Sequence, residues 1–372
     1  MLAVEEITTG DQCRAIKAAW NKLFAENEKC SVFLSYEWFE CCHRSYNAGK
    51  DLLILLVKDR NEMIGLAPLW EYQSSIRAVS VRKVGFITVP DTPFVDFVIK
   101  RGREKEVLNA VLQHLYIRRR KNWDVLTFDR WPVESLNYKV LRDLLLEKGK
   151  RFFVVSTSVS PYIPIQEKWE VFWESCSTRF RKTRRNIINR INKLGKVEIE
   201  CIAQDGTGAA YRDIVSVSER SWKQKEGIAI SSRGEVKDFF QALTDLGGQK
   251  GWLLVWLLKV NGIPIAMEYD LTWGGRVYAL RADFDEAYNE YSPGTYLEYQ
   301  IVKALFEEGY LEYNTGPGLN AYKLRWTKHV RENITLYACN DNLKGRIIWS
   351  QEKVLPILRW LKNLKIYLGM QK

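Results

Sequence analysis

The order of strand-like and helix-like segments repeats once along this chain. Residues 51–72 read as strand, turn and strand, and residues 253–271 do so again around Asn261-Gly262, a dipeptide favoured in tight hairpins. The segments IGLA (64–67) and IPIA (263–266) occupy matching places in the two halves. Beyond each strand pair, both halves continue as strand, helix, strand, helix and strand, which is typical of α/β folds. The sequence therefore predicts a mixed α/β protein of two tandem domains related by internal duplication.

Domain boundaries follow from this repeat and from a linker that contains Pro161 and Pro164. We expect a first domain at residues 1–160, a second at 161–342 and a basic amphipathic helix at 343–372. At the turn into the main helix, the first half has KRGR (100–103), whereas the second has YSPGT (291–295). The second half is therefore predicted to hold a ligand, and the first to be a degenerate partner with an acceptor-side or structural role.

The charge of the chain points to the class of its partner. A net charge of +11 and a pI near 9.2 favour a polyanion: nucleic acid, an anionic membrane surface, an acidic carrier protein or a phosphorylated cofactor. Seven cysteines without a CxxC pair and three histidines predict no metal site. The polar N-terminus and the short apolar runs at 52–57 and 253–258 predict a cytoplasmic protein, with peripheral contact at the inner membrane face as an extension.

A helix that begins near residue 292 is the most informative local feature. A strand at 276–283 precedes it, Ser292 stands at the N-cap position, Pro293 at the first helical position, and Gly309 follows its end. Amides at a helix start carry partial positive charge, and glycine lets a phosphate approach closely. The same residues suit a helix that is merely capped, so ligand binding is one of two interpretations.

Three segments carry a family resemblance: NEYSPGTYLEYQIVKAL (289–305), GPGLNAYKLRW (316–326) and the basic RFRKTRRNIINRINKLGKVEIE (179–200). Together with the duplicated element order, they resemble the Fem-like branch of the GNAT acyltransferase superfamily, and in particular the acetyltransferase-like domain of CelD-type bacterial proteins. The resemblance is good over about 170–339 and architectural over about 30–160. It implies tandem GNAT-like domains, an acyl thioester donor such as acetyl-CoA or another acyl-CoA, and an amine acceptor. The Fem enzymes proper use aminoacyl-tRNA instead.

Acyl transfer needs a base for the amine, stabilisation of the carbonyl oxygen and a proton or positive charge for the leaving thiolate. Asp283, at a strand end, and Glu268, on the preceding strand, are the candidates for the base or for ordering a water. Tyr322 is expected to protonate the thiolate, and Lys323 to neutralise the developing charge or hold a phosphate. Each carboxylate also reads as a solvated strand-end charge, and Lys323 as an exposed lysine on a helix.

The donor is expected along the strand 276–283 and at the helix start that follows. In a GNAT-like core this strand separates from its neighbour, which frees backbone amides to polarise the carbonyl. The residues predicted to bind the donor are Arg281, Ala282, Tyr291, Ser292, Gly294 and Thr295.

Two basic segments are left as candidate partner surfaces. Residues 175–197 hold eight basic residues and no acidic one, with Phe180, Ile187, Ile191 and Leu194 as an apolar stripe. This region, Arg179 to Lys196, suits an acidic carrier protein, tRNA phosphates or anionic lipid, or is simply a solvated face of a helix at 169–194. The segment 343–372 either lies on a membrane or packs on the body of the protein.

Three functions stay open on sequence. The leading one is an N-acyltransferase that moves an acyl group from an acyl-CoA or acyl-carrier thioester directly to a small-molecule, glycan or peptide amine. The second keeps this fold with aminoacyl-tRNA as donor. The third is a catalytically silent protein that binds membrane or nucleic acid, supported by a phosphate loop with the single glycine Gly294 where the standard GNAT loop has more.

Overall fold

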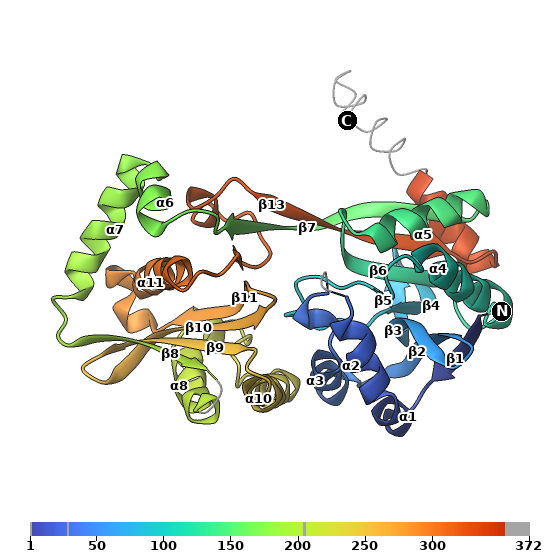
Figure 1. The fold of residues 1–372 in the computed structure, drawn as a ribbon, viewed down its shortest axis with the longest axis horizontal. Helices are drawn as coiled ribbons and strands as arrows, with labels where there is room; N and C mark the ends of the chain where they lie inside the picture. Colours follow the sequence, from blue (N-terminus) through green and yellow to red (C-terminus); the bar gives the residue numbers. More distant parts are fainter. Residues whose placement is uncertain (1, 28–29, 204–205, 354–372) are drawn as a thin grey trace, which may run out of the picture.

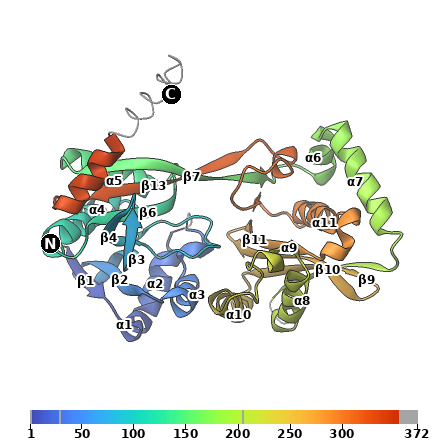
Figure 2. The same ribbon diagram turned by 180° about the vertical axis from the view of Figure 1, so that it is seen from behind.

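The computed structural model describes residues 2–27, 30–203 and 206–353, and it confirms the predicted α/β fold with a large mixed sheet. Two lobes lie side by side, and two long strands, β7 (Arg151–Pro164) and β13 (Val330–Cys339), run between them (Figure 1). The view from behind shows the same two strands joining the lobes (Figure 2).

The first lobe is built from residues before β7, and the second from residues between β7 and β13. The elements of the first lobe are β1 (Ala3–Ile7), α1 (Gly10–Ala15), α2 (Lys17–Ala25), η1 (Val32–Leu34), α3 (Tyr36–Tyr46), β2 (Lys50–Asp59), β3 (Glu62–Ile76), β4 (Val79–Phe86), β5 (Val98–Ile99), α4 (Glu104–Gln113), η2 (His114–Arg118), β6 (Val125–Pro132) and α5 (Leu136–Glu147). Those of the second are α6 (Trp169–Ser175), α7 (Thr178–Ile191), β8 (Val197–Ala203), α8 (Thr207–Glu219), α9 (Trp222–Lys225), α10 (Gly234–Gln249), β9 (Leu253–Val260), β10 (Ile263–Trp273), β11 (Arg276–Phe284), η3 (Glu286–Tyr291), α11 (Pro293–Glu307), β12 (Glu312–Asn314) and η4 (Lys323–Arg325).

Strand pairing repeats between the lobes as the sequence repeat predicts. In the first lobe, β3 pairs antiparallel with β4, and β4 pairs parallel with β6. In the second lobe, β10 pairs antiparallel with β11, and β11 pairs parallel with β12. The hairpin between β9 and β10 turns at Asn261 and Gly262, both with positive φ, as its Asn-Gly sequence predicts.

The two long strands tie the sheets of both lobes together. β13 returns to the first lobe and pairs with β6 over Asn333–Cys339, while its other edge pairs with β7. The far end of β7 pairs with β12 of the second lobe. The expected boundary at residue 160 therefore falls inside a continuous strand, and residues 330–339, assigned by sequence to the second domain, lie in the sheet of the first lobe. The division into independent domains stays a prediction.

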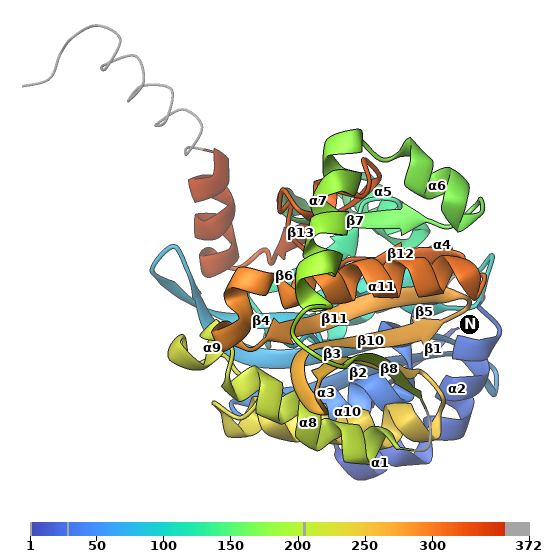
Figure 3. The ribbon, with the colours of Figure 1, turned by 90° about the vertical axis from the view of Figure 1, so that its left-hand side faces the viewer.

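The second sheet is covered differently on its two faces. Figure 3 shows α11 on one face and α8 and α10 on the other. On the α8 and α10 face the core is shared with the first lobe, where Phe239 of α10 contacts the rings of Trp38 and Tyr46 of α3. A second core lies under α6, α7 and α11. The shared core and the shared strands hold the first lobe against one face of β11.

Three predicted elements differ from the structure. The helix expected at 169–194 is broken into α6 and α7 at Cys176 and Ser177, because Ser177 accepts from the Phe180 amide and caps a new helix. The helix expected to carry Lys323 is the single short turn η4. The segment FVDFVI (94–99) has the composition of a strand, but it pairs only at Val98 and Ile99, so residues 87–97 form a loop.

The segment expected at 343–372 is described only as far as residue 353. Residues 343–353 are helical, and Ile348 is fully buried against Val81, Val125 and Cys339 of the first lobe. The rest of the predicted amphipathic helix, residues 354–372, lies outside the described residues. Across the described ranges, no helix has both the length and the apolar character required to cross a bilayer.

Candidate active site

β11 and β12 diverge in the second lobe and leave part of β11 open. They pair only over Arg276 to Tyr278, because β12 ends at Asn314 while β11 continues to Phe284. The chain after β12 turns at Gly316, which has a φ of +78°. Gly316 also lies close to β11, and a Cβ on it would be only 3.0 Å from the Ala279 carbonyl oxygen. Glycine is therefore required where this loop meets the opened strand.

Asn314 places an unsatisfied hydrogen-bond donor at this point of divergence. Its side-chain oxygen accepts from the Gly316 amide at 3.0 Å, so the Nδ2 group points the other way. That nitrogen is buried and has no acceptor among the described residues. A buried donor without a partner costs free energy, so it favours a ligand oxygen at this site. Sequence reasoning missed Asn314, since an Asn at a strand end reads as a turn residue.

A buried polar cluster lies on the α11 face of the sheet, beside the opened strand. Lys323 Nζ donates to the carbonyls of Gly316 and Pro317, each at 3.0 Å. Glu268, on β10, accepts from the Tyr313 hydroxyl on β12. Glu298 of α11 is also close enough to interact with the Lys323 charge. The structure thus brings together the two predicted residues Glu268 and Lys323, both of which are buried rather than solvated.

Burial shifts the pKa values in this cluster toward neutrality. It lowers the pKa of Lys323 to about 8, although Glu268 and Glu298 attract the ammonium and oppose that shift. It raises the pKa of Glu268 to about 7, against the opposing effect of the Tyr313 hydrogen bond. The pKa of Asp270, beside Glu268, is raised by burial and then by the Glu268 charge. Titratable groups with pKa values near 7 are suited to proton transfer.

Glu298 has a second partner, Arg184, which is one of the eight basic residues of 175–197 and is buried rather than on a solvated face. Arg184 Nη2 donates to Glu298 Oε2 at 2.9 Å, and its guanidinium lies over the rings of Phe180 and Trp326. Arg184 is spaced four residues from Phe180 and therefore belongs to the buried stripe of α7. Glu298 lies three residues before Ile301 on the buried face of α11, so helical spacing could have predicted that Glu298 is buried.

A separate charged cluster lies on the opposite face of β11, toward the first lobe. Asp283 is buried and pairs with Lys223 of α9 and with Arg281, whose Nε lies 3.0 Å from Asp283 Oδ2. Asp91 lies in the loop 87–97 of the first lobe. Burial raises its pKa, and the nearby charges of Arg281 and Lys223 oppose that rise only in part. Asp283 and Glu268 are therefore on different faces of the sheet and do not form one site. No local sequence pattern points to Asp91, which reaches this cluster from the other lobe.

The start of α11 is half-exposed, and it is arranged differently from the prediction. Ser292 has a φ of +57° and makes no side-chain cap, because it ends η3 as well as preceding α11. The amides of Thr295 and Tyr296 donate to the Ser292 carbonyl, and Pro293 has no N–H. Of the first-turn amides, that of Gly294 has no acceptor in the described part of the chain. A Cβ at Gly294 would lie 3.3 Å from Phe284.

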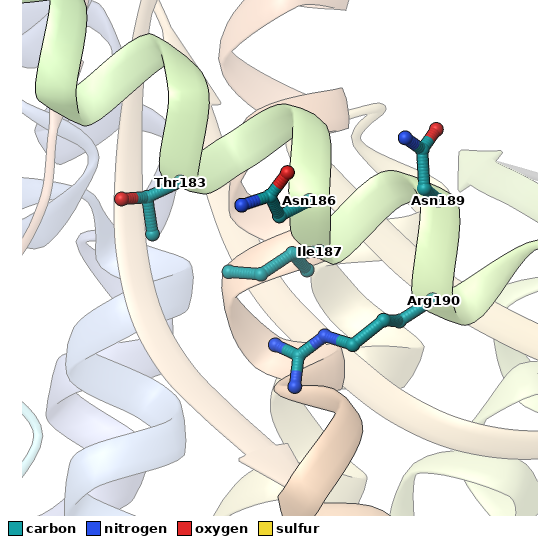
Figure 4. Close-up of a pocket in the computed structure, with 5 residues that line it drawn as sticks. All are labelled: Thr183, Asn186, Ile187, Asn189 and Arg190. Carbon is teal, nitrogen blue, oxygen red and sulfur yellow. The ribbon is translucent and has the colours of Figure 1, made fainter.

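A shallow cavity of about 480 Å³ lies on α7 (Figure 4). Arg190, at one end of it, donates to the Glu290 carbonyl at 2.9 Å, and that residue belongs to η3, just before α11. The cavity therefore adjoins the segment that contains Tyr291 and Ser292. Its lining residues are Thr183, Asn186, Ile187, Asn189 and Arg190.

Tyr322, the last predicted catalytic residue, is next to Lys323 but has 47% of its surface exposed. Partial burial raises the pKa of its phenol to about 12. It is therefore a weaker acid than the Lys323 ammonium at the same opening. Within the described ranges, no group of three or more His, Cys, Asp or Glu side chains is arranged to hold a metal ion.

Comparison with known proteins gives one sequence-family match and several shared folds. Residues 178–324, less than half of the chain, match the Acetyltransf_6 family, described as an acetyltransferase (GNAT) domain. No curated protein matches the sequence.

Among solved structures, similarity extends over nearly the whole chain at low identity. FemX is 14% identical with a TM-score of 0.59, and the match covers 93% of this chain and 100% of FemX. The C-terminal DUF2156 domain of a putative lysylphosphatidylglycerol synthetase from Agrobacterium fabrum is 12% identical with a TM-score of 0.53, covering 92% and 97%. A tandem GNAT protein from the clavulanic acid biosynthesis pathway is 10% identical with a TM-score of 0.50, covering 91% and 98%. These likenesses establish a shared tandem fold.

Proposed function

Residues 178–324 match a GNAT acetyltransferase domain, and the chain shares its fold with a tandem GNAT protein; on that premise we propose that it is an N-acyltransferase. It moves an acyl group from an acyl-CoA thioester to an amine by direct attack. The observation that carries the proposal is the buried Lys323 amine, with a pKa of about 8, beside the opening between β11 and β12. A buried amine with a pKa near neutral pH is suited to proton transfer.

The donor is proposed to lie along β11 with its phosphates at the start of α11. The free Gly294 amide and the partial positive charge of the helix start suit a phosphate, and Arg190 supplies a full charge from α7. The thioester then lies against the opened part of β11, residues 279–284, which includes Arg281 and Ala282. Tyr291, Ser292 and Thr295 border the phosphate position.

Residues on the two faces of the sheet carry different steps of the proposed reaction. The acceptor nitrogen attacks the carbonyl carbon, and the Asn314 Nδ2 donor stabilises the oxygen as it becomes negative. As the carbon–sulfur bond breaks, the Lys323 ammonium gives the thiolate a proton. Glu268 and Glu298 keep that ammonium charged near neutral pH.

The proton of the acceptor amine leaves on the other face, toward the first lobe. The Asp283 carboxylate is already engaged in ion pairs with two cations, Lys223 and Arg281. Asp91 faces the same cations without an ion pair in the described structure, and burial raises its pKa. We therefore assign the base to Asp91 and a positioning role to Asp283.

Gly294→Glu is expected to lower the affinity for acetyl-CoA at least tenfold, because it puts a carboxylate where the phosphate is proposed and crowds Phe284. Calorimetric titration with acetyl-CoA measures this. Gly208→Glu is the matched control, since Gly208 is likewise the second residue of a helix, α8, and has open space around it. Equal affinity in the two variants would place the donor phosphates elsewhere.

Asn314→Asp is expected to lower kcat about a hundredfold, because the carboxylate still accepts from Gly316 but cannot donate to the developing oxyanion. Acetyl-CoA affinity should change less than threefold, since the ground-state thioester gains little from that donor. Thiol release under saturating substrates gives kcat, and titration gives the affinity. A variant with normal kcat would remove Asn314 from the mechanism.

Aminoacyl-tRNA as donor is the second candidate, and one observation favours it. Arg179, Lys182, Arg185 and Lys193 of the α7 region are exposed and have no acidic partner within 4 Å among the described residues. Such a surface suits a polyanion. Salt-dependent binding of charged tRNA together with no heat on titration with acetyl-CoA would select this donor.

A further inference from the structure

A cavity of about 710 Å³ lies where the two lobes meet, away from the α11 start. Residues of the first lobe form most of its wall, and β11 and β13 close it from the other side. Its volume is in the range of small-molecule sites. The lining residues are Glu26, Asn27, Cys30, Ser31, Leu34, Phe94, Asp96, Phe97, Ile99, Arg101, Glu104, Pro132, Glu134, Ser135, Leu136, Asn137, Arg276, Tyr278 and Arg331.

Two buried polar atoms in this wall have no hydrogen-bond partner in the described structure: Ser31 Oγ and Asn137 Oδ1. Ser31 is 5% exposed and Asn137 9% exposed. The amide nitrogen of Asn137 donates to Asp96 and to the Phe97 carbonyl, which fixes its oxygen as the free acceptor. A hydroxyl and an amide oxygen left unsatisfied in one cavity favour a ligand with both donors and acceptors.

The charged groups of the cavity are already balanced. Asp96 accepts from the Ser135 hydroxyl, the Trp131 indole and the Phe97 amide as well as from Asn137. Arg331 is paired with Glu134 and Glu312. The remaining charged residues of the lining are two arginines, Arg101 and Arg276, and two glutamates, Glu26 and Glu104. Burial also raises the pKa of Cys30 to about 12, so that thiol is neutral.

At the start of α5, which also lines this cavity, Asp96 accepts from the Ser135 hydroxyl and the Asn137 amide, so the first lobe presents a carboxylate there rather than a free helix start. Its α4 corresponds to α11 in the repeat, and Glu104, at the first position of α4, accepts from the Gly102 amide at 3.1 Å. A carboxylate therefore stands where an anion would bind. Together with the balanced charges, this favours a ligand rich in neutral hydroxyls over a phosphorylated one.

The inner wall connects the cavity to the opening in the second sheet. Tyr278 lines the cavity and is the last residue of β11 that pairs with β12, so residue 279 begins the opened part. The ring of Phe94 contacts that of Tyr278, and the loop 87–97 continues from there to Asp91, near Arg281. A ligand seated against Phe94 and Tyr278 therefore lies beside the proposed thioester and base.

We propose that this cavity binds the acceptor, and that the acceptor is a hydroxyl-rich amine of the amino-sugar class. The proposal rests on the proposed function and names its substrate class. Ser31 and Asn137 bind ring hydroxyls, the flat faces of Phe94 and Tyr278 pack against the apolar face of the sugar ring, and the amine points along the loop toward Asp91.

Direct binding without any donor tests the proposal. The probe is methyl β-glucosaminide, titrated calorimetrically into the full chain, with cyclohexylamine as the comparison because it has the amine and the ring but no hydroxyls. The glucosaminide is expected to bind at least about tenfold more tightly. Equal affinities, or no binding of the glucosaminide, would overturn the proposal.

Two variants with matched controls locate the site. Ser31→Ala is expected to weaken glucosaminide binding about tenfold without lowering the unfolding temperature, because its hydroxyl has no partner to lose. Ser160→Ala is the control, since Ser160 is buried and unpaired in β7 but outside the cavity.

Leu136→Trp, at the exposed rim, should block binding, whereas Leu146→Trp, exposed farther along α5, should not. Unchanged binding in both Ser31→Ala and Leu136→Trp would place the acceptor elsewhere.

The outcomes separate this proposal from the proposed function. Cavity-dependent glucosaminide binding without thiol release from acetyl-CoA would leave the binding site standing and contradict the acyltransferase. Thiol release with cyclohexylamine that Leu136→Trp does not change would support the acyltransferase and overturn the cavity as acceptor site.

Discussion

Lys323→Met is expected to lower kcat for acyl transfer about a thousandfold, within the range that a positioned general acid contributes. The reason is that Lys323 is a buried amine with a pKa of about 8, next to the opening where the thiolate is proposed to leave. Methionine has a similar length and no charge. Thiol release at pH 7.5 with saturating acetyl-CoA and amine measures the effect.

The pH profile separates proton donation from a purely structural role of Lys323. If its ammonium is the acid, kcat of the wild-type protein should fall as pH rises through about 8, and this limb should be absent in Lys323→Met. Lys323→Arg keeps the positive charge but does not titrate in this range, so it should restore little activity.

Lys328→Met is the matched control, since Lys328 is exposed five residues away. Activity in Lys323→Met within tenfold of that control would remove Lys323 from the mechanism.

Glu268→Gln is expected to make the protein more stable and less active. The pKa of Glu268 is raised from 4.5 to about 7 by burial, so the folded state binds its proton more tightly than the unfolded state. The free energy of unfolding therefore falls as pH rises from about 4.5 to about 7, by about 3 kcal/mol for a shift of this size. Glutamine cannot ionise, so the variant should gain up to about 3 kcal/mol at pH 8 and lose this slope. Urea unfolding at pH 5 and pH 8 measures both.

Lys323 contributes the opposite slope at higher pH. Its pKa is lowered from 10.5 to about 8, so the folded state disfavours the charged form. Stability from this group rises as pH increases from about 8 to about 10.5. Glu268→Gln should keep this slope but start it at lower pH, because the Glu268 charge raises the Lys323 pKa, whereas Lys323→Met should remove the slope.

The catalytic result of Glu268→Gln follows from its effect on Lys323. Glu268 raises the Lys323 pKa, so its neutralisation should move the high-pH limb of kcat to lower pH and reduce kcat at pH 8 about a hundredfold. The matched control is Glu200→Gln, on the edge strand β8 of the same sheet, where Glu200 pairs with Lys259. A Glu268→Gln variant with unchanged stability and an unshifted profile would contradict the buried cluster as the source of the Lys323 pKa.

Much of the fold was predictable because it depends on local patterns. The Asn-Gly turn between β9 and β10, Pro293 at the start of α11 and the repeat of strand and helix order are all readable from neighbouring residues. The errors also have local causes. Ser177 caps a new helix and divides 169–194, and Ser292 takes a left-handed conformation that removes it from the capping role.

Sequence alone determined the element order, the duplicated α/β fold and the segments around 276–326 from which the site is proposed. Tertiary structure decided which side chains meet there, because those contacts join distant positions: Arg184 bonds Glu298 across 114 residues, and Tyr313 bonds Glu268 across 45. Tertiary structure also separated Asp283 from Glu268. Side chains alternate between the two faces of a strand, and the pairing register of β10 with β11 decides that these two carboxylates lie on opposite faces of the sheet. Periodicity specifies a buried face, but burial of a charge depends on a partner that the local sequence does not contain.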